Sequence, residues 1–166
     1  MAERDLERVR EIERAAGRLF AEAGMTEVAA HEPASADELR GYVRGERAWV
    51  AVDEADVPLG FVRADVVDGS AYIAELSVEP AFQRRGLGRR LVDEVAGWAR
   101  ARGLTALTLT TFREVPWNAR YYERLGFGAL GEAELPPGLA TIREREAERG
   151  LDREGPRVAM RRDLAG

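Results

Sequence analysis

The chain has 166 residues, of which 45% are hydrophobic, and its formal net charge is −5 at pH 7. This length supports one hydrophobic core, so we expect a single domain over residues 1–166. The negative charge provides no general attraction for phosphate backbones, which argues against nucleic acid as the main partner.

The cysteine and histidine content excludes several kinds of site. The chain has no cysteine, which rules out disulfides, thiolate metal sites and a cysteine nucleophile. It has one histidine, which rules out a histidine-rich metal site, and we expect no bound metal. The N-terminal segment is charged and no apolar run approaches the ~20 residues of a membrane span. We therefore expect a cytoplasmic protein with no membrane partner.

Two helices are predicted before the first strand. Apolar residues recur at intervals of three and four over residues 4–23, which predicts a helix that ends at Gly24. A capping box opens a second, short helix predicted over residues 35–44. Residues 25–33 follow neither pattern and are predicted to form a loop. His31 lies in this loop and is a candidate acceptor-binding residue, although a solvated loop side chain is the alternative.

Three strands joined by short turns are predicted next. Apolar and β-branched runs predict strands at residues 48–52, 59–64 and 71–78, and the turns between them make these strands antiparallel. On the third strand, Glu75 lies among apolar neighbours near the strand end, just before a glycine-bearing turn.

The segment after the third strand has the composition of an anion-binding turn. Gly86 and Gly88 allow a tight turn with outward N–H groups, and the start of the next helix adds unpaired donors and a positive dipole end. Positive charge is added nearby by four side chains, Arg84, Arg85, Arg89 and Arg90. These features favour a ligand with several phosphates, whereas an ordinary strand-to-helix connection with solvated arginines is the alternative.

The second half of the chain completes a mixed sheet. A helix from Leu87 to Gly103 and a strand over residues 104–111 form a right-handed crossover, which places that strand parallel to the third one. The remaining predicted elements are a helix at 117–125, a strand at 127, a polar helix at 139–149 and a closing strand at 157–164. The sequence therefore predicts an α/β (α+β) fold with a mixed, mostly antiparallel central sheet flanked by helices.

Three of these segments, taken together, resemble the GNAT superfamily of acyl-CoA-dependent N-acetyltransferases. They are Leu76 to Pro80, Gln83 to Gly88 and Tyr122 to Phe127, and the resemblance covers roughly residues 49–128. It implies a GNAT-like sheet in which two strands splay apart to form an acyl-CoA cleft. It also implies transfer of acetyl from acetyl-CoA to a primary amine by direct attack in a ternary complex, and it suggests a homodimer.

The resemblance assigns coenzyme-binding roles to two stretches. The backbone of Leu76, Ser77 and Val78 would pair with the pantetheine arm as an added strand and stabilise the charge that develops at the thioester oxygen. The pyrophosphate would be received by the turn residues Gln83, Arg84, Arg85, Gly86, Leu87, Gly88 and Arg89.

The resemblance also assigns two catalytic roles. Tyr122 matches the family tyrosine that protonates the departing thiolate, with a core tyrosine as the alternative. Glu75 matches an acidic residue that serves as general base, directly or through water, and an ion pair with a neighbouring arginine is the alternative. Trp117 and Tyr121 are candidates for the acceptor pocket, although aromatic side chains on helices more commonly pack against the core.

Two departures from the family pattern are visible. The chain starts almost directly in a helix, so the usual first strand is absent or replaced. The asparagine expected seven residues before the tyrosine is Val115 here, and Asn118 is the candidate to take over its hydrogen bond to the coenzyme.

Two functional alternatives stay open at this point. One is a catalytically silent acyl-CoA-binding module that acts in sensing or in docking a partner. The other concerns the acceptor, which is either a small molecule or a peptide amine; the negative charge of the protein favours cationic acceptors of either size.

Overall fold

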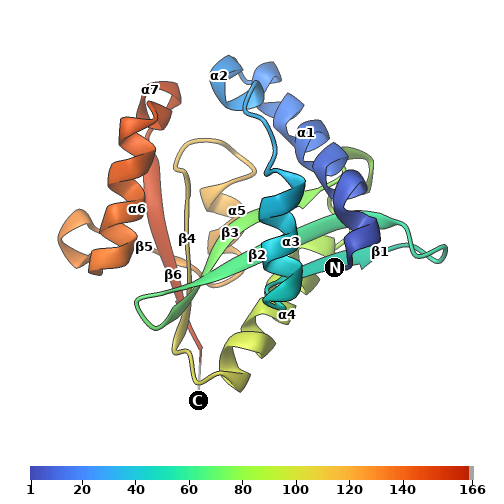
Figure 1. The fold of residues 1–166 in the computed structure, drawn as a ribbon. Helices are drawn as coiled ribbons and strands as arrows, with labels where there is room; N and C mark the ends of the chain where they lie inside the picture. The colour runs from blue at the N-terminus through green and yellow to red at the C-terminus, as the bar shows by residue number, and fades with distance from the viewer. Residues whose placement is uncertain (165–166) are drawn as a thin grey trace. The chain divides into compact units, whose positions relative to one another are not determined.

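The computed structural model describes residues 1–164, which form a six-stranded sheet flanked by helices (Figure 1). The strand order is β1-β2-β3-β4-β6-β5. The strands are β1 (Ala48–Val52), β2 (Pro58–Val67), β3 (Ser70–Val78), β4 (Ala106–Phe112), β5 (Gly128–Leu130) and β6 (Arg157–Asp163). β3 and β4 pair in parallel, whereas β1 with β2, β4 with β6 and β5 with β6 pair antiparallel, so the predicted mixed, mostly antiparallel sheet is confirmed.

Seven helices are present in the described residues, together with three short 3-10 turns. The helices are α1 (Leu6–Glu22), α2 (Thr26–Ala29), α3 (Ala36–Arg44), α4 (Leu87–Ala101), α5 (Ala119–Glu123), α6 (Pro137–Glu148) and α7 (Leu151–Glu154). The 3-10 turns are Glu3–Asp5, Pro80–Phe82 and Glu132–Glu134. Within residues 1–164, none of the helices combines the length and the apolarity that a membrane crossing requires.

Local sequence signals explain most of these elements. The Ser35 side chain accepts a hydrogen bond from the backbone N–H of Glu38 at 3.2 Å, so the predicted Ser35 cap opens α3, while the Glu38 carboxylate accepts from Arg63. The prediction of a loop over residues 25–33 was wrong in part, because α2 forms there. This helix is one turn long, too short to show a periodic apolar pattern. No strand precedes α1 in the described chain, in agreement with the departure from the family pattern.

The chain divides into two compact units, the first of which contains residues 1–65 and 73–95. Its core forms where α1 and α3 pack on β2. The buried side chains of this cluster are Leu6, Val9, Ile12, Ala34, Leu39 and Phe61. The apolar spacing of α1 thus positions the helix over the strands that precede the predicted anion-binding turn.

The second unit contains residues 66–72 and the chain from residue 96 onward. Its main ladder joins β4 and β6, from Ala106 opposite Asp163 to Phe112 opposite Arg157, and β5 pairs with the other edge of β6 (Figure 1). The first residues of β3 also belong to this unit. They pair with β4 over two positions, and the last of these pairs is Tyr72 with Thr108.

Candidate active site

The predicted anion-binding turn has two left-handed residues. Arg84 has φ of 61° and Gly86 has φ of 78°, so two residues of the turn between β3 and α4 adopt the left-handed conformation. Gly88, predicted to help form the turn, instead lies in the first turn of α4. The prediction that Gly88 forms part of the turn was wrong. The second left-handed residue of the turn is Arg84, and arginine is not a residue type that indicates this conformation in a sequence.

Helix α4 begins directly after this turn. Its first helical hydrogen bond runs from the Arg90 N–H to the Gly86 carbonyl at 3.1 Å. The N–H groups of Leu87, Gly88 and Arg89 therefore lie ahead of the helical ladder, at the positive end of a 15-residue helix. The arginine side chains at 84, 85, 89 and 90 are exposed around the turn. This arrangement can bind the oxygens of a phosphate group.

The end of β3 approaches β2 closely. A Cβ atom on Gly60 of β2 would lie 3.1 Å from the Ser77 carbonyl oxygen and 3.2 Å from the Val78 side chain. The Glu79 N–H donates to the Leu59 carbonyl at 2.8 Å, which holds β3 to β2 up to the start of the turn. Leu76 and Val78 are half-buried and Ser77 is buried, so one side of this backbone stretch is fixed by β2.

Glu75 is part of a charged cluster inside the first unit. The Ser77 hydroxyl donates to its Oε1 at 2.7 Å. The charge of Glu75 acts on Arg63 of β2 and on Glu13 of α1. Arg63 is the arginine on which the charge of Glu75 acts, and its guanidinium donates to Glu38 at 2.7 Å.

Glu13 is the residue of this cluster that sequence reasoning missed. Burial, together with the charge of Glu75, raises the pKa of Glu13 to about 7. A signal for it exists in the sequence, because position 13 lies four residues after Val9 and therefore on the apolar stripe of α1. A carboxylate that interrupts such a stripe needs an explanation.

Four further predicted site residues lie on or before α5, in the second unit: Trp117, Asn118, Tyr121 and Tyr122. The Asn118 carbonyl accepts hydrogen bonds from the N–H groups of Tyr121 at 2.9 Å and Tyr122 at 3.2 Å, so Asn118 starts this helix. The half-buried Tyr122 ring makes edge contacts with Tyr121 and Phe127, at centroid distances of 5.3 and 5.7 Å. Tyr121 is half-buried and Trp117 is exposed, so both can reach a ligand.

His31 is exposed directly after α2, and its backbone N–H donates to the Val28 carbonyl at 3.2 Å. It lies outside the charged cluster around Glu75. In the described part of the chain, no group of three or more acidic, histidine or cysteine side chains is arranged to hold a metal ion.

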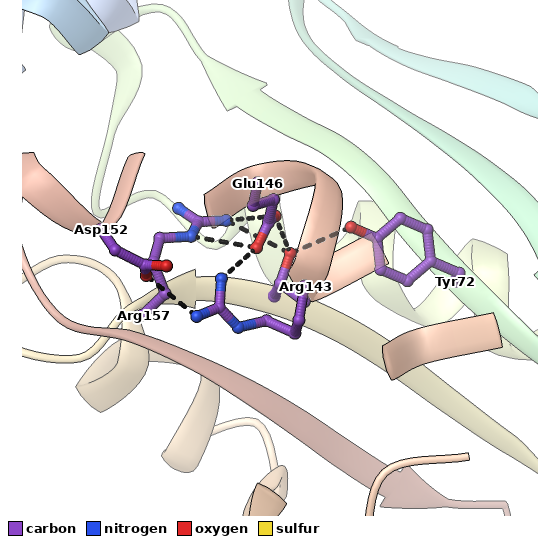
Figure 2. Close-up of polar contacts among 6 residues, drawn as sticks. Tyr72, Arg143, Glu146, Asp152 and Arg157 are labelled. Atoms are coloured by element: carbon purple, nitrogen blue, oxygen red, sulfur yellow. Dashed lines mark hydrogen bonds and ion pairs between the residues drawn. The ribbon is translucent and has the colours of Figure 1, made fainter. Parts of the chain in front are cut away.

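A second polar cluster, in the second unit, links α6 to two strands (Figure 2). Glu146 of α6 accepts from Arg157 Nη2 at 2.6 Å, from Arg143 Nη1 at 2.7 Å and from the Thr110 hydroxyl. The Tyr72 hydroxyl lies 3.0 Å from the Thr110 hydroxyl. The Glu146 and Arg157 side chains are only 12% and 10% exposed, so this carboxylate fixes α6 to β6 and β4.

Comparison of the sequence with known proteins finds similarity to acetyltransferases. The model of the acetyltransferase (GNAT) family matches residues 6–127. Over 65 residues, the chain is 43% identical to the mycothiol acetyltransferase of Thermobifida fusca, a match that covers 39% of this chain and 20% of that protein. Over 67 residues, it is 36% identical to the ribosomal protein bS18-alanine N-acetyltransferase of Salmonella typhimurium, covering 40% of this chain and 45% of that protein. The matches span less than half the length of these relatives.

A comparison of structures agrees on the fold. The PaiA N-acetyltransferase of Thermoplasma acidophilum, solved in complex with coenzyme A, superposes with a TM-score of 0.68 at 15% sequence identity. The match covers 98% of this chain and 95% of that one. At this identity, the likeness establishes the shared fold.

Proposed function

Because the chain belongs to the GNAT acetyltransferase family, we propose that it transfers an acetyl group from acetyl-CoA to the primary amine of an acceptor. The observation that supports this most strongly is the turn at Arg84 and Gly86 before α4. It combines a left-handed backbone at two positions, the N-terminal end of a long helix and four arginine side chains. A pyrophosphate group matches these donors in charge and in hydrogen bonding.

The second part of the proposed coenzyme site is the end of β3. The backbone of Leu76, Ser77 and Val78 would pair with the amide groups of the pantetheine arm, in the manner of an added strand. The close contact with Gly60 holds this stretch in place, which lowers the entropy cost of ordering it when the arm binds. Asn118 is proposed to add a hydrogen bond to the coenzyme.

On the way from an ammonium to an amide, the acceptor nitrogen loses two protons, one before it attacks and one afterwards. The departing sulfur gains one proton, which the second of these replaces, so one proton is released overall. The coenzyme supplies an activated acetyl thioester. An amine attacks only as the neutral base, so an ammonium acceptor must first lose a proton, and Glu75 is proposed to accept it directly or through water. Tyr122 is proposed to donate a proton to the sulfur as the bond to the acetyl carbon breaks. A backbone N–H group of the Leu76 to Val78 stretch would stabilise the negative charge that develops on the thioester oxygen.

The acceptor is proposed to be an amine of a small molecule or of a peptide, with His31, Trp117 and Tyr121 as candidate contacts. One of the relatives is named for a ribosomal protein alanine and the other for mycothiol, so amines of both sizes belong in a first screen. A thiol-release assay with acetyl-CoA and a panel of amines, amino acids, polyamines and N-terminal peptides tests the proposal. Release of free coenzyme A that depends on the acceptor supports it. Saturable acetyl-CoA binding without release over the whole panel would instead favour a silent binding module.

A further inference from the structure

A hollow of about 310 Å³ lies between α1 and the residue that follows β3, inside the first unit. Five residues of α1 and one residue after β3 line it: Arg8, Glu11, Arg14, Ala15, Arg18 and Glu79. Ala15 is buried and small, so the longer side chains on either side of it leave room between them. The volume lies at the lower end of the range for small-molecule sites, roughly 300–1,000 Å³.

The first arginine of the hollow is held by groups of the protein. Arg8 Nη2 donates to Glu79 Oε2 at 2.8 Å, and Arg8 Nη1 donates to Glu11 Oε2 at 3.2 Å. Arg8 Nε donates to the Pro58 carbonyl at 3.2 Å. The two carboxylates that line the hollow therefore balance Arg8, and this arginine forms part of the wall.

The other two arginines are not balanced in this way. Arg14 lies 3.8 Å from Glu32, whose side chain is 83% exposed, and an ion pair of this kind contributes little. Arg18 is exposed and makes no hydrogen bond or ion pair with the described residues 1–164. Arg14 and Arg18 are four residues apart on one helix, a spacing at which like charges repel each other. An anion bound between them would relieve this repulsion.

The charge of the hollow differs in sign from that of the whole chain. Three arginines and two glutamates give its lining a formal charge of +1, whereas the chain as a whole carries −5. At contact distance the local charges decide which ligand is favoured, because the charges elsewhere on the surface are screened by salt. The planar guanidinium group binds a carboxylate or a phosphate through two parallel hydrogen bonds.

Glu79 relates the hollow to the proposed coenzyme site. It directly follows the Leu76 to Val78 stretch, proposed to pair with the pantetheine arm, and it precedes the turn proposed to bind the pyrophosphate. At about 3.3 Å per residue, the Glu79 backbone lies within roughly 10 Å of Leu76. The hollow therefore flanks the thioester half of the coenzyme, and the coenzyme 3′-phosphate lies beyond the pyrophosphate.

We propose that Arg14 and Arg18 bind a carboxylate of the acceptor, and that the preferred acceptors are therefore amines whose own molecule carries a carboxylate. This inference rests on the proposed acetyl transfer and names the class of its acceptor. It reverses the preference for cationic acceptors that the net charge of the chain predicts. The two arginines determine specificity and orient the acceptor, and they take no part in proton transfer.

Binding of the carboxylate can be measured without acetyl transfer. Arginine side-chain N–H signals of the ¹⁵N-labelled protein are followed by NMR while pairs of amines are added at constant ionic strength. The pairs are glycine with glycinamide, β-alanine with β-alaninamide, and the peptide amide Ala-Asp with Ala-Asn, so the carboxylate comes from a small molecule or from a peptide. We expect saturable shifts of the Arg14 and Arg18 signals with acids and none with their amides. Acids that move these signals no more than that of Arg44, an exposed and unpaired arginine of α3, would overturn the proposal.

The thiol-release assay tests the same preference during turnover. We expect kcat/KM of the wild type to be about tenfold or more higher for an acid than for its amide. Arg18→Gln should raise KM for the acid by about tenfold, keep kcat, and leave the amide unaffected. Arg44→Gln makes the same change of charge away from the hollow and should leave KM unchanged. Equal kcat/KM for acid and amide in the wild type, or equal KM values in the two variants, would contradict the assignment.

The coenzyme itself is the other source of an anion, and dephospho-coenzyme A distinguishes it. If Arg18→Gln weakens binding of coenzyme A but not of dephospho-coenzyme A, the arginines hold the 3′-phosphate and the acceptor assignment is wrong. We expect both forms to bind Arg18→Gln as they bind the wild type. Acids that shift the Arg14 and Arg18 signals without any release of coenzyme A would support the anion site and overturn the proposed acetyl transfer, so the two failures are distinguishable.

Discussion

Arg84 and Gly86 share a left-handed backbone, with φ of 61° and 78°, although only the second is a residue type that adopts it readily. Successive backbone N–H groups in a turn can form an anion-binding concavity. The left-handed conformation of Arg84 costs on the order of 1 kcal/mol, so the turn needs a favourable interaction that offsets this cost. Binding of the coenzyme pyrophosphate would provide it.

Replacement of Gly86 by alanine tests this relationship. A Cβ atom at Gly86 would meet nothing within 4 Å, so the only structural cost is the left-handed φ, about 1 kcal/mol. We expect Gly86→Ala to weaken coenzyme A binding by about tenfold or more, because the N–H groups of the turn rotate away from the phosphates. Gly103→Ala is the matched control, with φ of 69° and equally open surroundings at the end of α4. Equal binding by the two variants would contradict the assignment of the turn.

The stability of the protein should depend on pH through Glu13. Its folded pKa, about 7, lies above the ordinary value of 4.5, so its contribution to stability is complete below pH 4.5 and is lost as the pH rises through 7. Glu13→Gln removes this loss. We expect the variant to gain stability relative to the wild type between pH 5 and 8, by on the order of 3 kcal/mol at most. Urea unfolding of the wild type and of Glu13→Gln, at pH 5 and at pH 8, measures the difference in their free energies of unfolding. The same difference at both pH values would show that Glu13 is ionised throughout this range.

The Glu146 cluster should be important for the stability of the second unit. Glu146→Gln keeps the shape of the side chain but leaves Arg157 and Arg143 without their shared carboxylate. Because the Arg157 side chain is only 10% exposed, we expect a loss of about 3 kcal/mol in the free energy of unfolding. Asp163→Asn, which removes the exposed partner of Arg161, is the control and should cost about 0.5 kcal/mol or less. Similar losses in the two variants would mean that Glu146 contributes only as a surface charge.

The Tyr122 hydroxyl is expected to act in the reaction while its ring acts in packing. The ring contacts with Tyr121 and Phe127 are retained in Tyr122→Phe, so the melting temperature should stay close to that of the wild type. We expect kcat to fall by roughly 10²-fold, with coenzyme A binding unchanged, because the departing sulfur loses its proton donor. An unchanged kcat would show that another group or water supplies this proton.

Features determined by short stretches of sequence could be predicted, and features that depend on tertiary contacts could not. The Ser35 cap of α3 and the bounds of β1 follow from residues next to one another in the chain, and both were predicted. The left-handed Arg84 was not, because its conformation is imposed by the turn as a whole. Helix α2 was missed because one helical turn has no apolar period.

The same distinction applies to the candidate site. The turn and the end of β3 form one continuous segment, so their residues could be identified together from the sequence. The coupling of Glu13 to Glu75 depends on the packing of α1 over the strands, and no pattern within either segment indicates it. The contact of Glu146 with Thr110 likewise requires α6 to fold back onto β4.

Calorimetric titration of the protein with acetyl-CoA tests the central claim most directly, because it measures whether the turn and the end of β3 bind the coenzyme at all. We predict saturable binding at one site per chain, weakened by added salt because charge pairing with phosphate contributes, and weakened in Gly86→Ala relative to Gly103→Ala. Absence of any binding heat at high protein concentration, at two temperatures and for both acetylated and free coenzyme A, would contradict the account.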